Sequence, residues 1–193
     1  KTGFFLDQRE NRRILGEFSR GKSVLNCFCY TGGFSMYALQ NGASEVHSID
    51  ISQSAMDMVQ VNHDLNKYGD NHKIDTANVM HALADKTITK SDIVIVDPPA
   101  FAKSVKKRHN AVQAYKRLNI MALKKVNRGG YLFTFSCSQV VGPELFYNTI
   151  RSAAIESGRT IRIVKHLSQG SDHPINIYHP EGNYLKGLVL YVE

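Results

Sequence analysis

The sequence predicts an α/β fold, in which about seven strands form a mostly parallel sheet with helices on both faces and one antiparallel strand near an edge. Short apolar runs alternate with segments whose apolar residues recur at helical spacing, as expected of strands joined by crossover helices. The run at 92–97 is almost continuously apolar, which is typical of a strand buried on both faces. No helical spacing separates the last two runs, which favours a hairpin-like antiparallel pair there.

In the N-terminal half, apolar runs and helix-ending residues define the elements. Residues 1–22 are rich in Arg and are expected to form a helical lead-in to the sheet. Asn41-Gly42 can end a helix, and Ser52 can cap the start of the next one. Strands are therefore expected at 23–29, 45–50 and 72–75, with helices at 34–40, from 52 through 62, and from about 78.

The C-terminal half continues the alternation. A long helical pattern covers 110–126, and Gly129-Gly130 is expected to stop it. Another helix is expected from Pro143 to about Ser157. The remaining strands are expected at 92–97, 131–135, 160–167 and 184–192, and no linker divides the chain, so 1–193 is expected to be one domain.

The composition excludes several classes of protein. A hydrophobic content of 42% argues against disorder, and no apolar run approaches the ~18–20 residues that span a bilayer. The chain shows no charged-then-apolar leader and has only three cysteines, so a reduced, cytoplasmic protein is expected. Cys27-x-Cys29 would place both thiols on one face of a strand but lacks a second pair, and the histidines are scattered, so no metal site is expected.

The net charge of +7 is unevenly distributed. Between Asp97 and Glu144 there is no acidic residue, and the nine basic residues are Lys103, Lys106, Lys107, Arg108, Lys116, Arg117, Lys124, Lys125 and Arg128. A solvated helix face is the usual meaning of such a run, but that face would normally mix both signs. The position of this window, directly after the run at 92–97, favours a track for the phosphate backbone of a nucleic acid.

The first candidate site is the glycine turn after the strand at 23–29. In a parallel sheet, ligands bind beyond the carboxyl ends of the strands. Gly32-Gly33 would let the backbone approach a ligand, and Asp50 stands 17 residues beyond Gly33, where a carboxylate can bind the hydroxyls of a ribose. The third glycine of a dinucleotide site is missing, which favours a nucleoside without a diphosphate, S-adenosylmethionine above all. The alternative is a turn with no ligand.

The second candidate site is Asp97-Pro98-Pro99, which follows the strand at 92–97. Two prolines stiffen the segment, and the Asp97 carboxylate with nearby carbonyls could accept hydrogen bonds from a nucleobase. Phe101 could stack on that base. Simple chain punctuation is the alternative.

The third candidate is Cys137, at the carboxyl end of the strand at 131–135. A thiol there could act as a nucleophile if its pKa were lowered. Cys27 and Cys29 are expected to be small buried hydrophobic residues instead.

Five motifs together resemble the catalytic domain of the bacterial 23S ribosomal RNA cytosine-C5 methyltransferases of the RlmI (YccW) type. They are KTGFFLDQR at 1–9, NCFCYTGGF at 26–34, DPPAFAK at 97–103, FSCS at 135–138 and YLKG at 184–187. The resemblance implies a class I, Rossmann-like methyltransferase domain that uses S-adenosylmethionine and leaves S-adenosylhomocysteine. It also implies a 23S ribosomal RNA substrate and no membrane or metal partner. The family's N-terminal PUA-type RNA-binding module is expected to be absent from this chain.

The resemblance also assigns roles to residues. The turn at 30–33 would hold the methionine part of the cofactor, Asp50 the ribose, and Ile51 and Asn78 the adenine. Asp97 would contact the cofactor's amino group or the target base, and Cys137 would be the nucleophile. The full cofactor set is Asn26, Phe28, Tyr30, Thr31, Gly32, Gly33, Asp50, Ile51, Ser52, Asn78 and Asp97. The expected RNA contacts are Arg9, Phe101, Lys103, Lys106, Lys107, Arg108 and Lys116.

One departure and two alternatives accompany the resemblance. Ala100 stands where many RNA cytosine-C5 methyltransferases carry a second Cys, and no residue is evident as the base for the C5 proton. A guanine-N7 methyltransferase, which needs no nucleophilic Cys, would share similar opening and glycine-turn motifs. A non-catalytic RNA-binding module would bind RNA without the cofactor.

Overall fold

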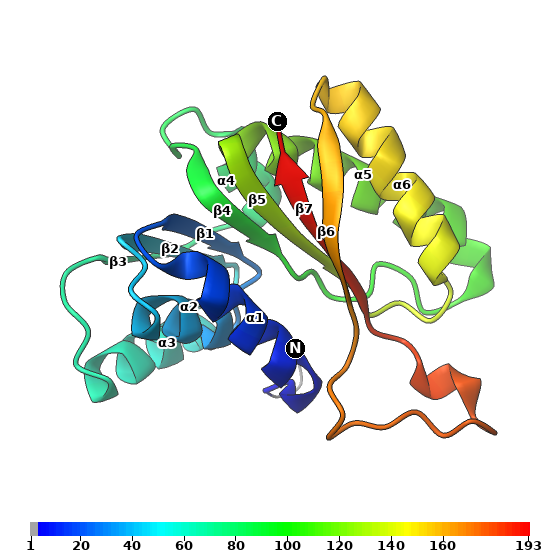
Figure 1. Ribbon diagram of the computed structural model, residues 1–193, viewed down its shortest axis with the longest axis horizontal. Coiled ribbons are helices and arrows are strands. Elements are labelled where there is room, and N and C mark those ends of the chain that lie inside the picture. The colour runs from blue at the N-terminus through cyan, green and yellow to red at the C-terminus, as the bar shows by residue number, and fades with distance from the viewer. Residues whose placement is uncertain (1–3) are drawn as a thin grey trace.

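The computed structural model describes residues 4–193, whose elements follow the expected alternation of strands and helices (Figure 1). The strands are β1 (Ser23–Cys27), β2 (Glu45–Asp50), β3 (His72–Thr76), β4 (Ser91–Val96), β5 (Val126–Ser136), β6 (Ile161–Leu167) and β7 (Lys186–Val192). The helices are α1 (Arg9–Ser19), α2 (Gly33–Gln40), α3 (Gln53–Leu65), α4 (Val79–Ala84), α5 (Arg108–Lys125) and α6 (Pro143–Ser157). Short 3-10 helices are η1 (Leu6–Gln8), η2 (Val105–Lys107) and η3 (Pro180–Gly182). Residues 1–3, which open the lead-in and the first motif, lie outside the described residues.

The seven strands form one mixed sheet in the order β3-β2-β1-β4-β5-β7-β6. The pairs from β3 to β5 are parallel, whereas β7 is antiparallel to both β5 and β6. The predicted α/β sheet, with one antiparallel strand beside the edge strand, is confirmed.

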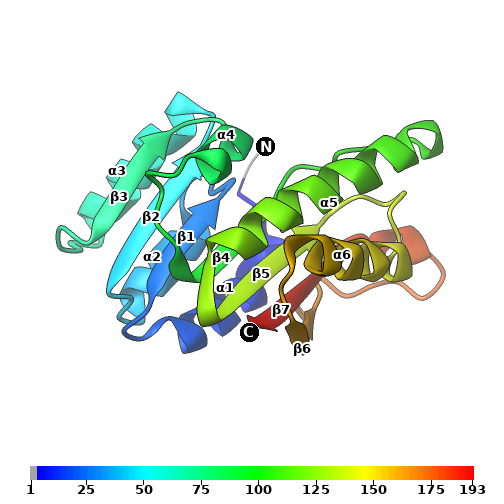
Figure 2. The same cartoon turned by 90° about the horizontal axis from the view of Figure 1, so that it is seen from above.

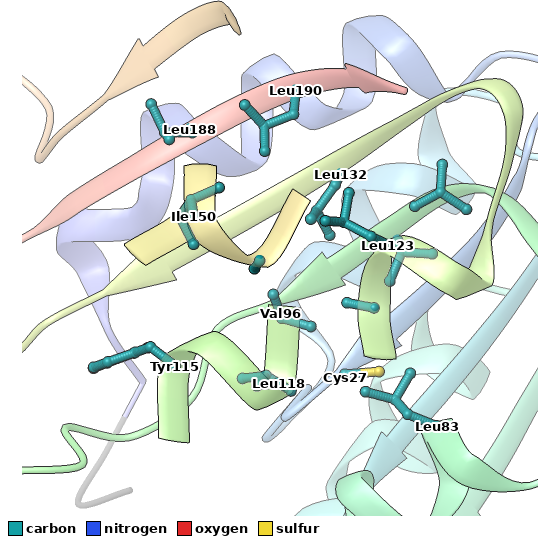
Figure 3. Packing of buried hydrophobic residues seen from close by; sticks show 14 of the residues in the cluster. Cys27, Leu83, Val96, Tyr115, Leu118, Leu123, Leu132, Ile150, Leu188 and Leu190 are labelled. Carbon is teal, nitrogen blue, oxygen red and sulfur yellow. The ribbon is translucent and has the colours of Figure 1, made fainter. Parts of the chain in front are cut away.

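Each face of the sheet carries its own core. Ile93 and Ile95 of β4 pack in a cluster with α1 and α2, while Val94 and Val96 pack in a cluster with α4, α5 and α6. Successive side chains of a strand point to opposite faces, so a strand covered on both sides must be apolar throughout. Figure 2 shows the helices on the two faces of the sheet. Figure 3 shows the cluster around Val96, Leu118 and Ile150.

The glycine pair after α5 has a different role from the predicted one. The helix ends at Lys125, and Gly129-Gly130 lies inside β5 rather than stopping the helix. A Cβ on Gly130 would stand 2.4 Å from the carbonyl oxygen of Asp92, and Gly129 has φ +80°. The register of β4 against β5 also shifts here, between Ser91 and Ile93. The glycines therefore permit an irregular, close approach of the two strands.

The expected strand face carrying Cys27 and Cys29 is also wrong. β1 ends at Cys27, and Phe28 (φ 59°) and Tyr30 (φ 51°) take the left-handed conformation. Cys29 turns into a separate cluster, with its sulfur 3.6 Å from that of Met56. Both cysteines are buried, as expected for small hydrophobic residues.

Candidate active site

The carboxyl ends of four strands lie level at one edge of the sheet. Cys27 of β1 pairs with Ile49 of β2 and with Val96 of β4, and Val96 pairs with Thr134 of β5. The strand order reverses between β1 and β4, and open α/β sheets bind their ligands at such a point. The glycine turn, Asp50, Asp97 and Cys137 all follow or end these strands.

Asp97 and Cys137 line one cavity of about 340 Å³. The Cys137 sulfur lies 4.0 Å from the carbonyl oxygen of Pro98. The structure thus brings together the two residues for which the sequence predicts chemistry. The remaining lining residues are Phe5, Asp7, Gln8, Pro98, Pro99, Ala100, Lys103 and Leu185.

The lead-in supplies part of this cavity, which the sequence did not indicate. Gln8 is 3% exposed, and its side-chain amide donates to a carboxylate oxygen of Asp97 at 3.3 Å. Asn11 in turn donates to the Gln8 oxygen at 2.6 Å. Because that oxygen is already held by Asn11, the Gln8 nitrogen must face Asp97. The lead-in therefore orients the Asp97 carboxylate.

Asp7 adds a buried carboxylate to the same cavity. The Tyr184 hydroxyl donates to Asp7 Oδ2 at 2.5 Å, and Asp7 Oδ1 is buried without a hydrogen-bond partner among the described residues. Burial, followed by the Asp7 carboxylate, raises the pKa of the Tyr184 phenol. The phenol therefore keeps its proton at neutral pH and remains a hydrogen-bond donor to Asp7.

The glycine turn forms the second half of the site. Asp50 accepts backbone hydrogen bonds from Tyr30 (2.9 Å) and from Ser52 (3.1 Å), one on each carboxylate oxygen. This carboxylate ties the turn after β1 to the turn after β2. Each oxygen keeps a second lone pair, so Asp50 can still accept from the two hydroxyls of a ribose.

A narrow pocket joins this turn to the cavity of Cys137. Phe28, Tyr30, Thr31 and Gly33 line it, and it shares Phe5, Gln8 and Asp97 with the larger cavity. A Cβ on Gly33 would stand 2.8 Å from the Phe4 ring and 3.1 Å from Arg12 Cδ. Arg12 also lies over the Phe4 ring, 4.4 Å from its centroid. Gly33 thus permits the lead-in to approach the turn closely. The sequence analysis had expected a ligand in that space.

The other predicted cofactor residues line neither of these two pockets and differ in their exposure. Ile51 is 68% exposed beside Asp50 and offers an apolar surface to a purine ring. Ser52 caps α3, and Asn78 caps α4 through its side-chain oxygen, which leaves the Asn78 amide nitrogen able to donate. Asn26 is fully buried, donates to Ser35 at 2.8 Å, and lines neither pocket. The exposed Ile51, the free lone pairs of Asp50 and the Asn78 amide fit a nucleoside-containing cofactor.

The structure divides the basic window. Lys103 lines the cavity, and Lys106, Lys107 and Arg108 are exposed in and beside η2, at the start of α5. Lys125 is buried at the other end of α5. This helix has 18 residues and is therefore about 27 Å long. Lys103 is thus at the cavity itself, and Lys106, Lys107 and Arg108 follow it within five residues of the chain.

The three other predicted RNA contacts already have protein partners. Lys116 forms an ion pair with Glu156 of α6 at 2.6 Å. Arg9 forms one with Asp172 at 3.5 Å, in the segment before β7. The Phe101 ring packs on Tyr115, with centroids 4.7 Å apart.

No helix within 4–193 is long and apolar enough to cross a membrane. No group of three or more His, Cys, Asp or Glu side chains in that range is placed to hold a metal ion.

Comparison with known proteins identifies relatives of this chain. The model of S-adenosylmethionine-dependent methyltransferases matches residues 1–177. Ribosomal RNA large subunit methyltransferase I of Aeromonas hydrophila is 43% identical over 199 residues, which cover 98% of this chain and 49% of that protein. The chain therefore spans about half the length of the curated relatives it matches.

Two solved structures share the fold. A structure described as an S-adenosylmethionine-dependent methyltransferase from Streptococcus mutans superposes with a TM-score of 0.87 at 26% identity, covering 99% of this chain and 50% of that one. SMU.776, described as a methyltransferase in complex with S-adenosylhomocysteine, gives 0.86 at 25%, covering 97% and 50%.

Proposed function

Because the chain belongs to the family of S-adenosylmethionine-dependent methyltransferases, we propose that it methylates C5 of a cytosine in 23S ribosomal RNA through a covalent adduct with Cys137. The observation that carries this proposal is the cavity that Cys137 shares with Asp97. A nucleophile and a hydrogen-bonding carboxylate stand there next to the pocket of the glycine turn. That arrangement suits a base that must be attacked and methylated in one place.

The cofactor residues divide into two groups. Tyr30, Thr31 and Gly33, with Phe28 and Asp97, would hold the methionine part in the narrow pocket. Asp50 would bind the ribose, and Ile51 with Asn78 would lie against the adenine. Gly32, Ser52 and Asn26 would act by shaping the turns that carry these groups. When bound, the cofactor supplies an electrophilic methyl group on a sulfonium.

The chain's own residues would make the cytosine reactive. C5 of cytosine is a poor nucleophile until a thiolate adds to C6. Attack by the Cys137 sulfur, with N3 protonated or hydrogen-bonded, gives an enamine whose C5 can accept the methyl group. Asp97, which accepts a hydrogen bond from Gln8, would hydrogen-bond the base during that attack. A base then removes the C5 proton, the bond between C6 and the Cys137 sulfur breaks, and the C5–C6 double bond of the ring is restored.

The basic residues beside the cavity would hold the RNA. Lys103, Lys106, Lys107 and Arg108 could neutralise phosphates on either side of an unstacked cytosine. Arg9, Phe101 and Lys116 would contribute only if the RNA displaced their present partners. A ribosomal RNA substrate would place the reaction in the cytoplasm.

The proposal is tested in cells that lack the gene encoding this chain. Complementation with the wild-type gene is expected to restore one 5-methylcytosine in 23S ribosomal RNA, measured by mass spectrometry of nuclease fragments. Cys137→Ala should leave that cytosine unmodified, while Cys27→Ala, at a buried cysteine outside the cavity, should restore it.

Two outcomes would contradict the proposal. An unchanged methylation map in the deletion strain would exclude this ribosomal RNA as the substrate. A lost 7-methylguanosine that Cys137→Ala still restores would identify the ring-nitrogen alternative, which needs no thiolate.

A further inference from the structure

Lys186 is a buried amine that the proposed reaction does not use. It opens β7 and is 4% exposed. β7 pairs with β5 so that Lys186 stands opposite Ser136, the residue before Cys137. Its ammonium donates to the carbonyl oxygen of Ser138 at 2.6 Å and to that of Tyr184 at 2.9 Å. The amine therefore lies directly behind the turn that carries the thiol.

No carboxylate of residues 4–193 forms an ion pair with Lys186. Both of its hydrogen-bond acceptors are neutral carbonyls. Burial lowers the pKa of Lys186 to about 8, and the charge of Cys137 acts in the opposite direction. Buried charges are normally paired, because desolvation of a lone ion is costly. Cys137 is the neighbour whose charge raises the pKa of Lys186, so its thiolate would serve as the partner.

We propose that Lys186 is a positioning residue that stabilises the thiolate of Cys137 and so keeps the nucleophile ready for attack. The inference rests on the proposed function, in which Cys137 is the nucleophile. The thiol proton leaves to water, and Lys186 keeps its own proton. The ion pair would consist of the Cys137 sulfur and the Lys186 ammonium across the β5–β7 pair.

The other titratable groups near Cys137 cannot supply this effect. Asp7 and Asp97 line the same cavity, and carboxylates oppose formation of a neighbouring thiolate. The phenols of Tyr115 and Tyr184 lie near Cys137, and burial raises the pKa of each, so both are neutral at pH 7. Lys103 is a cation at the cavity but is exposed, so water and salt screen it. Lys186 is the buried cation of the group.

Lys125 provides a matched control. It is also buried, at 9% exposure, and its ammonium donates to the carbonyl oxygens of Asp85 (2.6 Å) and Ile88 (2.5 Å). It lies at the far end of α5, and the charges that act on it are those of Asp85 and Lys90. Replacing Lys125 thus removes a similar set of contacts without touching Cys137.

The test measures the rate at which iodoacetamide alkylates Cys137 between pH 5 and 10, with the modified peptide identified by mass spectrometry. It needs neither RNA nor cofactor. Lys186→Met is expected to raise the apparent pKa of Cys137 by about one unit, which slows alkylation at pH 7 about tenfold. Lys186→Arg should restore most of the rate, and Lys125→Met should match the wild type.

Identical pH profiles for wild type and a folded Lys186→Met variant would overturn the inference. If Lys186→Met does not fold, the reciprocal measurement replaces it. The amine pKa of Lys186, followed by NMR of ¹³C-labelled lysine, should fall in Cys137→Ser, and no fall would overturn the inference equally. Loss of 5-methylcytosine formation with an unaltered profile would leave the proposed function intact and reject only the role of Lys186.

Discussion

Gln8 donates a hydrogen bond from its side-chain amide to the Asp97 carboxylate at 3.3 Å, although the two residues are 89 positions apart in the chain. Asn11 fixes the other end of the Gln8 amide, so the direction of this bond is set. The lead-in to the sheet is thus a wall of the cavity that Asp97 shares with Cys137, and it contributes to the orientation of the carboxylate after β4.

Replacing Gln8 should therefore impair both cofactor binding and turnover. Gln8→Ala removes a hydrogen bond to a charged group, worth about 1.5–3 kcal/mol, which corresponds to a loss of roughly 10- to 100-fold. Gln8→Glu should be worse, because it places a second carboxylate beside Asp97. Calorimetry with S-adenosylmethionine and methylation assays measure the two effects. Gln60→Ala removes a comparable bond to Asp64 on the exposed face of α3 and should change neither. Wild-type affinity and turnover in Gln8→Ala would show that Asp97 is held by other means.

Gly33→Ala should destabilise the lead-in against the glycine turn. The new Cβ would meet the Phe4 ring at 2.8 Å and Arg12 Cδ at 3.1 Å, so both side chains must move. Overpacking of this kind costs about 1–3 kcal/mol, to be measured by urea unfolding. A Gly69→Ala control, with nothing within 4 Å of the new Cβ, should be close to neutral. Combining Gly33→Ala with Phe4→Ala should cost less than the two single effects added together. Simple additivity would mean that Phe4 does not cause the loss.

The stability of the protein should fall as pH is lowered from about 6.5 to about 4. Burial, followed by the charges of His63 and His47, lowers the pKa of His72 to about 4, and its ring bonds to Ser48 at 2.7 Å and to His63 at 3.2 Å. In this interval the unfolded chain binds a proton at His72 and the folded chain does not, so protons favour unfolding. The full shift corresponds to roughly 3 kcal/mol.

The measurement is the free energy of unfolding across that interval for three proteins. His72→Asn should be less stable at pH 7 but should lose less stability on acidification than the wild type. His81→Asn changes an exposed histidine and should follow the wild type. Parallel pH profiles for wild type and His72→Asn would contradict the assignment.

The strands were predictable because buried strand positions are occupied by apolar residues, which can be recognised in the sequence. β4 is covered on both faces, so each residue from Ile93 to Val96 is apolar, and the predicted strand (92–97) is shifted from the observed one (91–96) by one position at each end. The meeting of Asp97 and Cys137 was predictable for a related reason, since both follow parallel strands whose carboxyl ends must share an edge.

Contacts between distant segments were not predictable in this way. Gln8, Asp7 and Arg12 sit in a helical lead-in whose sequence shows only its polarity, and nothing local indicates that it folds back over the glycine turn. The prediction that Gly129-Gly130 ends the helix was wrong for the same reason, because the role of the pair depends on a distant segment. A glycine pair ends a helix or permits a close approach of two strands, and only the position of β4 decides between them.

The placement of β7 also determines when the sheet can be completed during synthesis. β6 is made before β7 but hydrogen-bonds only to β7 within the described sheet, so it has no strand to join until residues 186–192 have left the ribosome. Tyr184, Leu185 and Lys186 arrive in the same late stretch. A nascent chain that has already folded β1 to β5 therefore has its glycine turn in place, while the Cys137 thiol still lacks β7 behind it. The domain should become active only in the last step of its own folding.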